Sequence, residues 1–342
     1  MIVVTGGAGF IGRYVVSTLV RNGFPVRVVD NLVKKTSNQS GLDNVEFMKG
    51  DLLKTSVSDR ALEDAEVCIH LAARIGGVKY FHDFPATILD QNSRLLSNIF
   101  NSSVKKGVKK VVYISSSMVF EQARTIPTPE SAISESPPPF SHYGFSKLQG
   151  EYFCTAYWRE YGLKYVICRP FNAYGAGEMP EDEVGVAHVI PDLIRKILKG
   201  DYPLEILGDG KQTRCFSYVQ DIADAICLLT FDPRAECEDF NIGNSRETSI
   251  MELAQMLWML CDRNEPFKVR GSPPLEFDVP RRVPDISKIV RLIGWKPKVN
   301  LEEGLPITIQ WMMNLALNEL MSLSTAYGDL CRDHKTREDE EV

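Results

Sequence analysis

A tyrosine and a lysine four residues apart, Tyr143 and Lys147, are the residues of this sequence best suited to moving a proton. Side chains at this spacing lie on one face of a helix, so the ammonium group would lie beside the phenol. A tyrosine that acts as a base near neutral pH must have its pKa lowered by about 3 units, which costs about 4 kcal/mol. One lysine charge about 4 Å away contributes that much at an effective dielectric constant of about 20. The pair therefore predicts a general base for a hydroxyl group.

Ser115, Ser116 and Ser117 lie upstream of this pair, at the end of the predicted strand Lys110–Ser115. Ligands of parallel α/β sheets bind at the carboxyl ends of the strands, so we expect a serine hydroxyl to share a site with Tyr143. A tyrosine and a lysine at this spacing also occur by chance as neighbours on a surface helix. The serines, together with a glycine loop at the start of the chain, favour the catalytic interpretation.

The chain opens on a strand-like run, Ile2–Thr5, that leads through a glycine-rich turn into a helical pattern, Arg13–Arg21. The glycines of this turn are Gly6, Gly7, Gly9 and Gly12. They allow the backbone to approach a pyrophosphate, whose charge the helix N-terminus then stabilises. Asp30, at the end of the next predicted strand, suits the ribose hydroxyls of NAD and would repel the extra phosphate of NADP. NAD is therefore the favoured cofactor, although Lys34 and Lys35 are close enough in sequence to offset part of that repulsion.

Short β-rich runs alternate with helical stretches through the first half of the chain, as in βαβ units. The predicted strands are Ile2–Thr5, Val26–Asp30, Val45–Lys49, Val67–Leu71, Lys110–Ser115 and Lys164–Arg169. The fold class is therefore α/β, a Rossmann-type doubly wound parallel sheet with helices on both faces. The helical stretches Pro85–Lys106 and Tyr143–Tyr161 either cover this sheet or pair two subunits in a homodimer.

After Gly175 the alternation weakens, which indicates a smaller lobe interwoven with the first domain. We expect residues 1–174 to form the NAD-binding domain, with a further strand from near 215–245. Residues 175–320 would form mainly the substrate-binding lobe, and residues 321–342 a flexible tail. The predicted elements of the lobe are the helices Ile190–Leu198, Asp221–Phe231, Ser249–Cys261 and Leu301–Leu320 and the strand Leu204–Leu207. The proline-rich segment Glu121–Phe140 exceeds a typical connection in length, so we expect it to be functional or mobile.

The composition is that of a globular chain of 342 residues, 44% hydrophobic and 25% charged. A formal net charge of −6 gives no global attraction to nucleic acid or to anionic membranes. No apolar run reaches the roughly 18 residues of a membrane span, and Met1–Val4 already reads as a strand, so we expect a cytoplasmic protein. The eight cysteines contain no C-x-x-C pair and the five histidines show no ligand spacing, so we expect neither disulfides nor a metal site.

Ordered motifs in this chain resemble the extended short-chain dehydrogenase/reductase family, particularly its branch of nucleotide-sugar epimerases and dehydratases, which includes UDP-glucose 4-epimerases. The resemblance extends from Met1 to about Leu305. Besides the glycine loop, the serines and the Tyr-Lys pair, the matching segments are Gly50–Leu52, Leu71–Ala73, Asn92, Arg169–Gly175, Gly208–Arg214 and Leu292–Pro297. Family members place the catalytic hydroxyl three residues before a Val-Tyr pair. Val119-Phe120 occupies that place here and selects Ser116, so the implied catalytic residues are Ser116, Tyr143 and Lys147.

The resemblance also implies the ligand contacts. In it, Asp51 and Leu52 flank the adenine, and Asn92 braces the helix that carries Lys147. The implied cofactor-binding residues are Gly6, Gly9, Phe10, Ile11, Asp30, Asn31, Asp51, Leu52, Leu71, Ala72, Ala73, Asn92, Ser115, Tyr143, Lys147 and Pro170.

The implied substrate contacts divide between the diphosphate and the nucleobase. Asn172, Arg214, His188 and Val189 would lie near the diphosphate, and Glu205 and Leu207 near the base; the alternative for each is a packing or surface role. The full implied set is Ser116, Ser117, Asn172, His188, Val189, Glu205, Leu207, Arg214, Arg281 and Arg282.

The reaction is inferred by elimination. In the family, members that eliminate water, decarboxylate or epimerise beside the ketone commonly carry an acid, a base or a cysteine just after the catalytic hydroxyl. Here those positions are Ser117 and Met118, and a thioether has no proton to transfer. We therefore expect an NAD-dependent nucleotide-sugar 4-epimerase that works through a transient 4-keto sugar. Glu121 or Glu135 could instead supply the extra group, which leaves a dehydratase or a net oxidoreductase open, and a non-catalytic NAD-binding protein is a further alternative.

Three departures from the family pattern leave the nucleotide open. Leu275–Asp278 stands where an Arg-Pro-Gly-Asp sequence is usual, so Arg281 or Arg282 would replace the missing phosphate ligand. Cys215 and Gln220 replace two further aspartates. A UDP-sugar is favoured, but the fragment Arg74–Val78 is similar to members that act on GDP-sugars.

Overall fold

The computed structural model describes residues 1–33, 42, 44–75, 80, 83–180, 188–273 and 279–317. Several predictions fall outside these residues: those on Lys34 and Lys35, on Leu275–Asp278, on Gly76–Val78 and on the tail 321–342.

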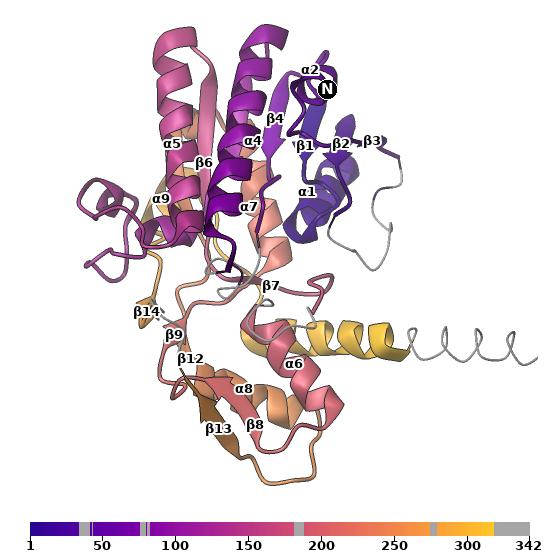
Figure 1. Ribbon diagram of the computed structural model, residues 1–342, viewed down its shortest axis with the longest axis vertical. Helices are drawn as coiled ribbons and strands as arrows, with labels where there is room; N and C mark the ends of the chain where they lie inside the picture. The colour runs from indigo at the N-terminus through magenta and orange to yellow at the C-terminus, as the bar shows by residue number, and fades with distance from the viewer. Residues whose placement is uncertain are drawn as a thin grey trace, which may run out of the picture.

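Seven parallel strands form one central sheet in the order β11-β6-β5-β4-β1-β2-β3 (Figure 1). The strands are β1 (Ile2–Thr5), β2 (Val26–Asp30), β3 (Glu46–Lys49), β4 (Val67–His70), β5 (Lys110–Ile114), β6 (Lys164–Pro170) and β11 (Glu238–Ile242). The six strands predicted from the first half of the chain are present with ends shifted by at most one residue. β11 is the strand expected near 215–245. The Rossmann-type parallel sheet is thus confirmed.

The strand order reverses at β1, which pairs with β2 on one side and β4 on the other. In doubly wound sheets the crevice for a dinucleotide opens at the carboxyl ends of the strands at such a reversal. The glycine turn begins directly after β1, so it lies in this crevice.

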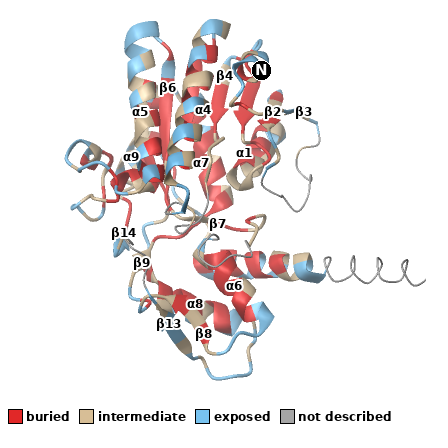
Figure 2. Cartoon of the chain, viewed as in Figure 1, coloured by how far each residue is buried: buried red, intermediate tan, exposed pale blue. Residues whose placement is uncertain are grey.

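Helices cover both faces of the sheet because each presents an apolar stripe to it. One face is covered by α1 (Phe10–Arg21), α7 (Val219–Phe231) and α9 (Ser287–Ile293), the other by α2 (Thr55–Ala61), α4 (Pro85–Lys106) and α5 (His142–Tyr161). Figure 2 shows the buried side of each layer turned toward the strands. Val16 and Leu19 of α1, for example, are fully buried, and each such side chain contributes roughly 1.5–3 kcal/mol. α1 begins three residues before the predicted start, so the N–H groups of Phe10 and Ile11 belong to its first turn.

A second, smaller core lies below the sheet in Figure 1. It is formed by α6 (Val189–Lys199), α8 (Ile250–Leu260) and the helix of residues 301–317, packed on β8 (Leu204–Leu207) and β13 (Val269–Ser272). The remaining elements are β7 (Ala173–Tyr174), β9 (Thr213–Arg214), β10 (Ser217–Tyr218), β12 (Thr248–Ser249), β14 (Arg281–Arg282) and the 3-10 turns η1 (Ser117–Phe120), η2 (Glu130–Ser134) and η3 (Pro233–Ala235). Between α6 and α8 the chain returns to the first domain as α7 and β11, and after β14 it returns again as α9, so the two lobes are interwoven.

The proline-rich segment Glu121–Phe140 is attached to the sheet. The buried carboxylate of Glu130 accepts a hydrogen bond from the Asn241 backbone N–H at 2.9 Å, and Thr128 N–H donates to the Val283 carbonyl at 2.8 Å. These contacts fix the middle of the segment beside β11.

None of the helices in the described ranges has the length and apolar character needed to cross a bilayer.

Candidate active site

The glycine turn after β1 depends on the absence of side chains. Gly6 has a φ of +69°, and a Cβ on Gly12 would lie 2.2 Å from the carbonyl oxygen of Gly6. Only glycine therefore lets the first turn of α1 approach the loop this closely. Gly9 is the residue before α1, so the N–H groups of Phe10 and Ile11 open the helix at the crevice. A helix N-terminus of this kind binds phosphate groups.

Asp30 lies at the rim of this turn. Its carboxylate accepts hydrogen bonds from Ala8 N–H at 3.1 Å and from Leu32 N–H at 2.8 Å. These bonds fix the carboxylate at the end of β2 and leave lone pairs for the hydroxyls of a ribose. Asn31 follows it, and its side-chain oxygen accepts from Val33 N–H.

The other implied cofactor residues lie at neighbouring strand ends. Asp51 and Leu52 follow β3 and Leu71, Ala72 and Ala73 follow β4, while Ser115 follows β5 and Pro170 ends β6. The Ala72 N–H donates to Thr5 Oγ1 at 3.4 Å. Because all these strands are parallel, their ends lie along a single edge of the sheet.

The three implied catalytic residues meet at the end of β5. Tyr143 and Lys147 are one turn apart on α5 and both are buried. The Tyr143 hydroxyl hydrogen bonds with the Ser116 hydroxyl, which also accepts from Met118 N–H at 3.2 Å. The serine indicated by the Val119-Phe120 pair is thus the one that contacts the phenol.

Burial affects the phenol in a direction that the sequence does not indicate, because the charges of Lys147 and of the nicotinamide are both expected to lower the pKa of Tyr143. Burial raises the pKa of Tyr143 well above its usual value, and the hydrogen bond from Ser116 only partly opposes this. The Lys147 ammonium donates to the Ile114 carbonyl at 2.8 Å and lies 5.9 Å from the Tyr143 ring centre. Desolvation of the phenolate thus opposes the lowering of the Tyr143 pKa that the positive charges of the site are expected to cause.

Lys147 is itself desolvated, and burial lowers its pKa to about 8 while the charge of Glu151 acts in the opposite direction. Asn92 of α4 donates to Ser146 Oγ at 3.0 Å and so contacts α5 directly beside Lys147. Its side-chain oxygen accepts from Arg74 N–H at 2.7 Å.

His70 is a residue of this site that the sequence analysis missed. It is buried at the end of β4, its Nδ1 hydrogen bonds with Thr5 Oγ1 at 2.7 Å, and it lines a cavity of about 10 Å³ together with Asn92 and Lys147. Burial, aided by the charge of Lys147, lowers the pKa of His70 to about 3, so the imidazole is neutral. The available signal was its place immediately before the Leu71–Ala73 motif.

Glu121, which the sequence left open as an extra acid or base, is bound to the start of α5. Its two carboxylate oxygens accept from the backbone N–H and the hydroxyl of Ser141, at 2.8 and 2.6 Å. Ser141 in turn caps α5 by accepting from Gly144 N–H. Ser117 lies buried in the first position of η1.

Two of the implied phosphate ligands, Arg214 and Arg282, are partners in register in the small sheet β12-β9-β14. Arg214 also donates to the Val279 carbonyl at 2.7 Å. Arg281 forms a bidentate ion pair with Glu247 at 2.7 and 2.8 Å. Asn172, with a φ of +39°, donates from its side chain to the Cys215 carbonyl.

The remaining implied substrate residues lie around β8 and the start of α6. Glu205 is paired with Arg270 at 3.0 Å, and Leu207 ends β8. His188 precedes Val189, the first residue of α6, and its Nδ1 hydrogen bonds with the buried carboxylate of Glu178.

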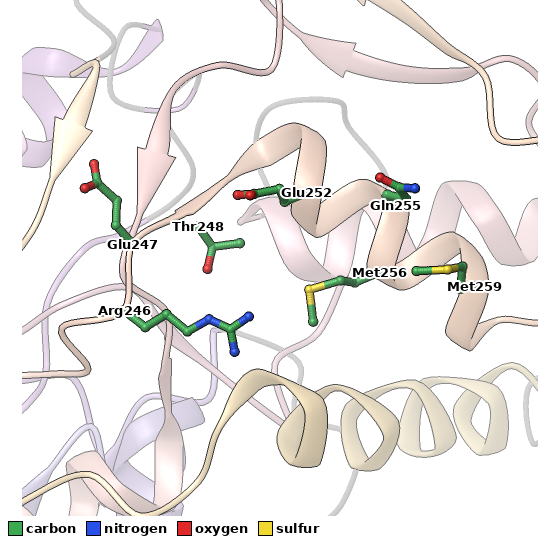
Figure 3. A pocket seen from close by; sticks show the side chains of 7 residues that line it. All are labelled: Arg246, Glu247, Thr248, Glu252, Gln255, Met256 and Met259. Atoms are coloured by element: carbon green, nitrogen blue, oxygen red, sulfur yellow. The ribbon is translucent and has the colours of Figure 1, made fainter.

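A larger surface cavity, of about 250 Å³, lies elsewhere on the second lobe. It is lined by Arg246, Glu247, Thr248, Glu252, Gln255, Met256 and Met259. Figure 3 shows Arg246 and Met256 pointing into it, whereas Glu247 points away. The cavity contains none of the catalytic or cofactor residues implied by the sequence.

The model of the NAD dependent epimerase/dehydratase family matches residues 2–243, about two thirds of the chain. The chain belongs to this family. NAD is therefore its cofactor, and the glycine turn, the open first turn of α1 and the Asp30 carboxylate fit that molecule.

Relatives in the NAD dependent epimerase/dehydratase family carry several activities in their names. A putative UDP-glucose 4-epimerase of Methanocaldococcus jannaschii is 36% identical, over 92% of this chain and 99% of its own length. A UDP-N-acetyl-α-D-glucosaminuronate decarboxylase of Bacillus cytotoxicus is 33% identical (91% and 97%), and GDP-L-fucose synthase 1 of Arabidopsis thaliana is 29% identical (93% and 94%). The UDP-glucose 4-epimerase of Thermotoga maritima, solved with UDP-glucose, is 33% identical with a TM-score of 0.82 (92% and 98%). The names of these relatives share one feature, an enzyme that acts on a nucleotide sugar.

Proposed function

We propose that this chain is a nucleotide-sugar 4-epimerase that works through a transient 4-keto sugar. The observation that carries the proposal is the hydrogen bond between the Tyr143 and Ser116 hydroxyls beside the glycine-loop crevice, with Ser117 and Met118 next to it. That arrangement can withdraw a proton from one sugar hydroxyl and return it. It places no second acid or base directly after Ser116 to eliminate water or to epimerise beside the ketone.

In the proposed reaction Tyr143 accepts the proton of the sugar hydroxyl while Ser116 donates a hydrogen bond to the same oxygen. Bound NAD supplies the hydride acceptor and a positive charge that favours the phenolate. Lys147, held on the Ile114 carbonyl, adds a second positive charge to the site. The 4-keto sugar then turns over and receives the hydride on its other face, and Tyr143 returns the proton.

Arg214, Arg282, Asn172 and the start of α6 at Val189 are proposed to bind the diphosphate, because a guanidinium matches a phosphate in both charge and geometry. Glu205 and Leu207 would lie near the base. A UDP-sugar is the favoured substrate.

The experiment is to incubate purified protein with UDP-glucose, UDP-N-acetylglucosamine and their uronic acids and to analyse the products. We expect the C4 epimer of at least one without added NADH. Loss of water or carbon dioxide, or stoichiometric consumption of free cofactor, would contradict a 4-epimerase. Tyr143→Phe should abolish turnover and retain NAD binding. An NAD-binding protein without catalysis would show no turnover in either form.

One observation favours a second candidate, epimerisation beside the ketone of a GDP-sugar. His188 hydrogen bonds with the buried carboxylate of Glu178, and an imidazole oriented by a carboxylate is a competent acid or base. Turnover in deuterium oxide separates the two candidates. A direct 4-epimerase leaves the sugar carbons free of deuterium, whereas epimerisation at C3 or C5 introduces it and should be lost in His188→Asn.

A homodimer through α4 and α5 is also proposed. These helices pack against each other, and the outer face of α5 exposes Phe145 and Tyr152, two large apolar side chains seven residues apart. Such a surface on a globular protein is typical of an interface. Sedimentation should show a dimer that Tyr152→Glu weakens, and a monomeric wild type would reject the proposal.

A further inference from the structure

A buried carboxylate on α5 links Lys147 to the neighbouring strands. Glu151 lies one helical turn beyond Lys147, on the same face of α5. One of its oxygens accepts from Ser115 Oγ at 2.6 Å and from Arg169 Nε at 2.8 Å, and the other accepts from Arg169 Nη2 at 2.7 Å. The Arg169 side chain on β6 is only 1% exposed. The bidentate pair is therefore shielded from water.

The same arginine extends the linkage toward the surface. Arg169 Nη1 donates to Asp239 of β11 at 2.7 Å, and Asp239 accepts from Lys288 of α9 at 2.5 Å. The guanidinium also lies over the Phe120 ring, 5.1 Å from its centre. Phe120 ends η1, the turn that follows Ser116. Arg169 thus supports the segments on both sides of the catalytic serine and the helix that carries the tyrosine.

We propose that Glu151 is a positioning residue for the reaction, in which its carboxylate maintains the Lys147 ammonium and fixes Ser115, while Arg169 holds that carboxylate in place. This inference rests on the proposed role of Lys147 in catalysis. Glu151 would contribute to the charge of the site but would not contact the substrate.

The surroundings of Lys147 explain why a carboxylate is needed. His70 of β4 is neutral, and the Tyr113 ring of β5 lies 5.5 Å from the ammonium. Tyr143 is the phenol of the site itself. The Lys147 ammonium donates to the Ile114 carbonyl, and the negative charge of Glu151 on the same face of α5 opposes the effect of burial on it. Burial already lowers the pKa of Lys147 to about 8; removing the Glu151 charge would lower it further, and less ammonium would remain near neutral pH.

Stability alone is a weak explanation for this ion pair, because buried pairs often contribute little net stability compared with apolar residues of the same volume. Burial tends to lower the pKa of Arg169, but the charges of Glu151 and Asp239 outweigh burial and raise it. The arginine therefore stays charged and keeps the carboxylate oriented over the whole pH range of activity.

The test compares the pH profiles of kcat for wild type, Glu151→Gln and Glu130→Gln. Glu130 of η2 is a similarly buried carboxylate that accepts from the Asn241 backbone N–H of β11 and does not influence the Lys147 charge, so it serves as the matched control. In the wild type we expect kcat to fall on the alkaline side near pH 8, where Lys147 loses its charge. In Glu151→Gln we expect this fall at a pH lower by about 1 unit or more. In Glu130→Gln the alkaline fall should not move, even if that variant is less stable. If Glu151→Gln lost the same fraction of kcat at every pH and the alkaline fall stayed at the wild-type pH, the role of Glu151 would be structural only.

A direct titration separates this inference from the proposed function. In protein labelled at lysine Cε, the Lys147 resonance is identified by its absence in Lys147→Arg and followed with pH. We expect the midpoint of this titration to fall in Glu151→Gln. We expect the same in Glu151→Leu/Arg169→Met, which leaves no buried arginine without its carboxylate and is the variant to use if Glu151→Gln does not fold. An unchanged midpoint overturns the inference, whereas an inactive wild type overturns the proposed function and leaves this readout intact.

Discussion

The cofactor side and the substrate side of the crevice hold their polar groups in different ways. At the strand ends, Asp30 is fixed by backbone N–H groups. On the smaller lobe the charged side chains pair with one another, as in Arg281 with Glu247 and Glu205 with Arg270. If these residues bind as proposed, a dinucleotide would meet groups that are already in place, while a sugar diphosphate would compete with existing ion pairs. Changes on the two sides should have effects of different size.

The largest effect is expected from Ser116→Ala. Removing the hydroxyl that shares the sugar oxygen with Tyr143 should lower kcat by about 100- to 1,000-fold. NAD binding, measured by calorimetry, should be unchanged. Met118→Leu is the matched control on the same turn and should retain kcat, because the thioether has no chemical role. A lower kcat in Met118→Leu would mean that Met118 takes part in the reaction.

Asp30→Ala should act on the cofactor side alone. Loss of a charged acceptor for the ribose costs about 1.5–3 kcal/mol, or about 10- to 100-fold in NAD affinity. Asp30→Asn removes the charge but keeps one side-chain oxygen, so it preserves only one of the two hydrogen bonds, from Ala8 N–H or from Leu32 N–H, and its NAD affinity should fall between those of wild type and Asp30→Ala. If Asp30→Ala weakened the binding of the nucleotide sugar as much as the binding of NAD, the two sides of the crevice would not be separate.

His70 makes the cofactor side sensitive to acid. Its pKa is about 3 in the folded chain and about 6.5 when unfolded, so the unfolded state binds more protons between these values. Stability is full above pH 6.5 and is lost as pH falls toward 3, by about 2 kcal/mol at pH 5. Urea unfolding at pH 7 and pH 5 should show this loss in wild type and a smaller one in His70→Asn. Parallel losses in both proteins would exclude His70 as the cause.

Arg281→Ala should have the smallest effect. The side chain is exposed and already paired, so we expect KM for the nucleotide sugar to rise less than about 3-fold. Arg214→Ala should raise KM by about 10-fold or more, since charge-assisted bonds to phosphate are stronger. A reversal of this order would make Arg281 the main phosphate ligand.

The sheet was predictable because parallel strands buried on both faces are continuous apolar runs. That Tyr143 and Lys147 lie one turn apart on a helix was predictable from their spacing, and Ser116 was selected by the family resemblance; the catalytic roles of the three stay a prediction. The network of Glu151, Arg169 and Asp239 was not predictable. Glu151 is 18 residues from Arg169 and meets it through the packing of α5 on β6, and Asp239 is 70 residues from Arg169 and meets it through the pairing of β6 with β11.

The burial of the Tyr143 phenol could not be predicted from the sequence for a related reason. Sequence spacing brings the phenol and the Lys147 ammonium onto one face of a helix, but it does not report how deeply that face is buried. In Tyr143 burial decides the direction of the pKa. The pairing of Glu205 with Arg270 likewise depends on strand register in the second lobe, which no local pattern indicates.

β11 joins the sheet from a late part of the sequence, so the first half of the chain does not contain the complete sheet. A fragment ending at residue 174 would contain the glycine loop, Ser116, Tyr143 and Lys147. It would also expose the unpaired edge of β6 and the apolar face of α1 that α7 covers. Bare edges of this kind recruit other chains. Such a fragment is expected to aggregate, and segment exchange with a homologue would have to transfer residues 219–242 along with the first half.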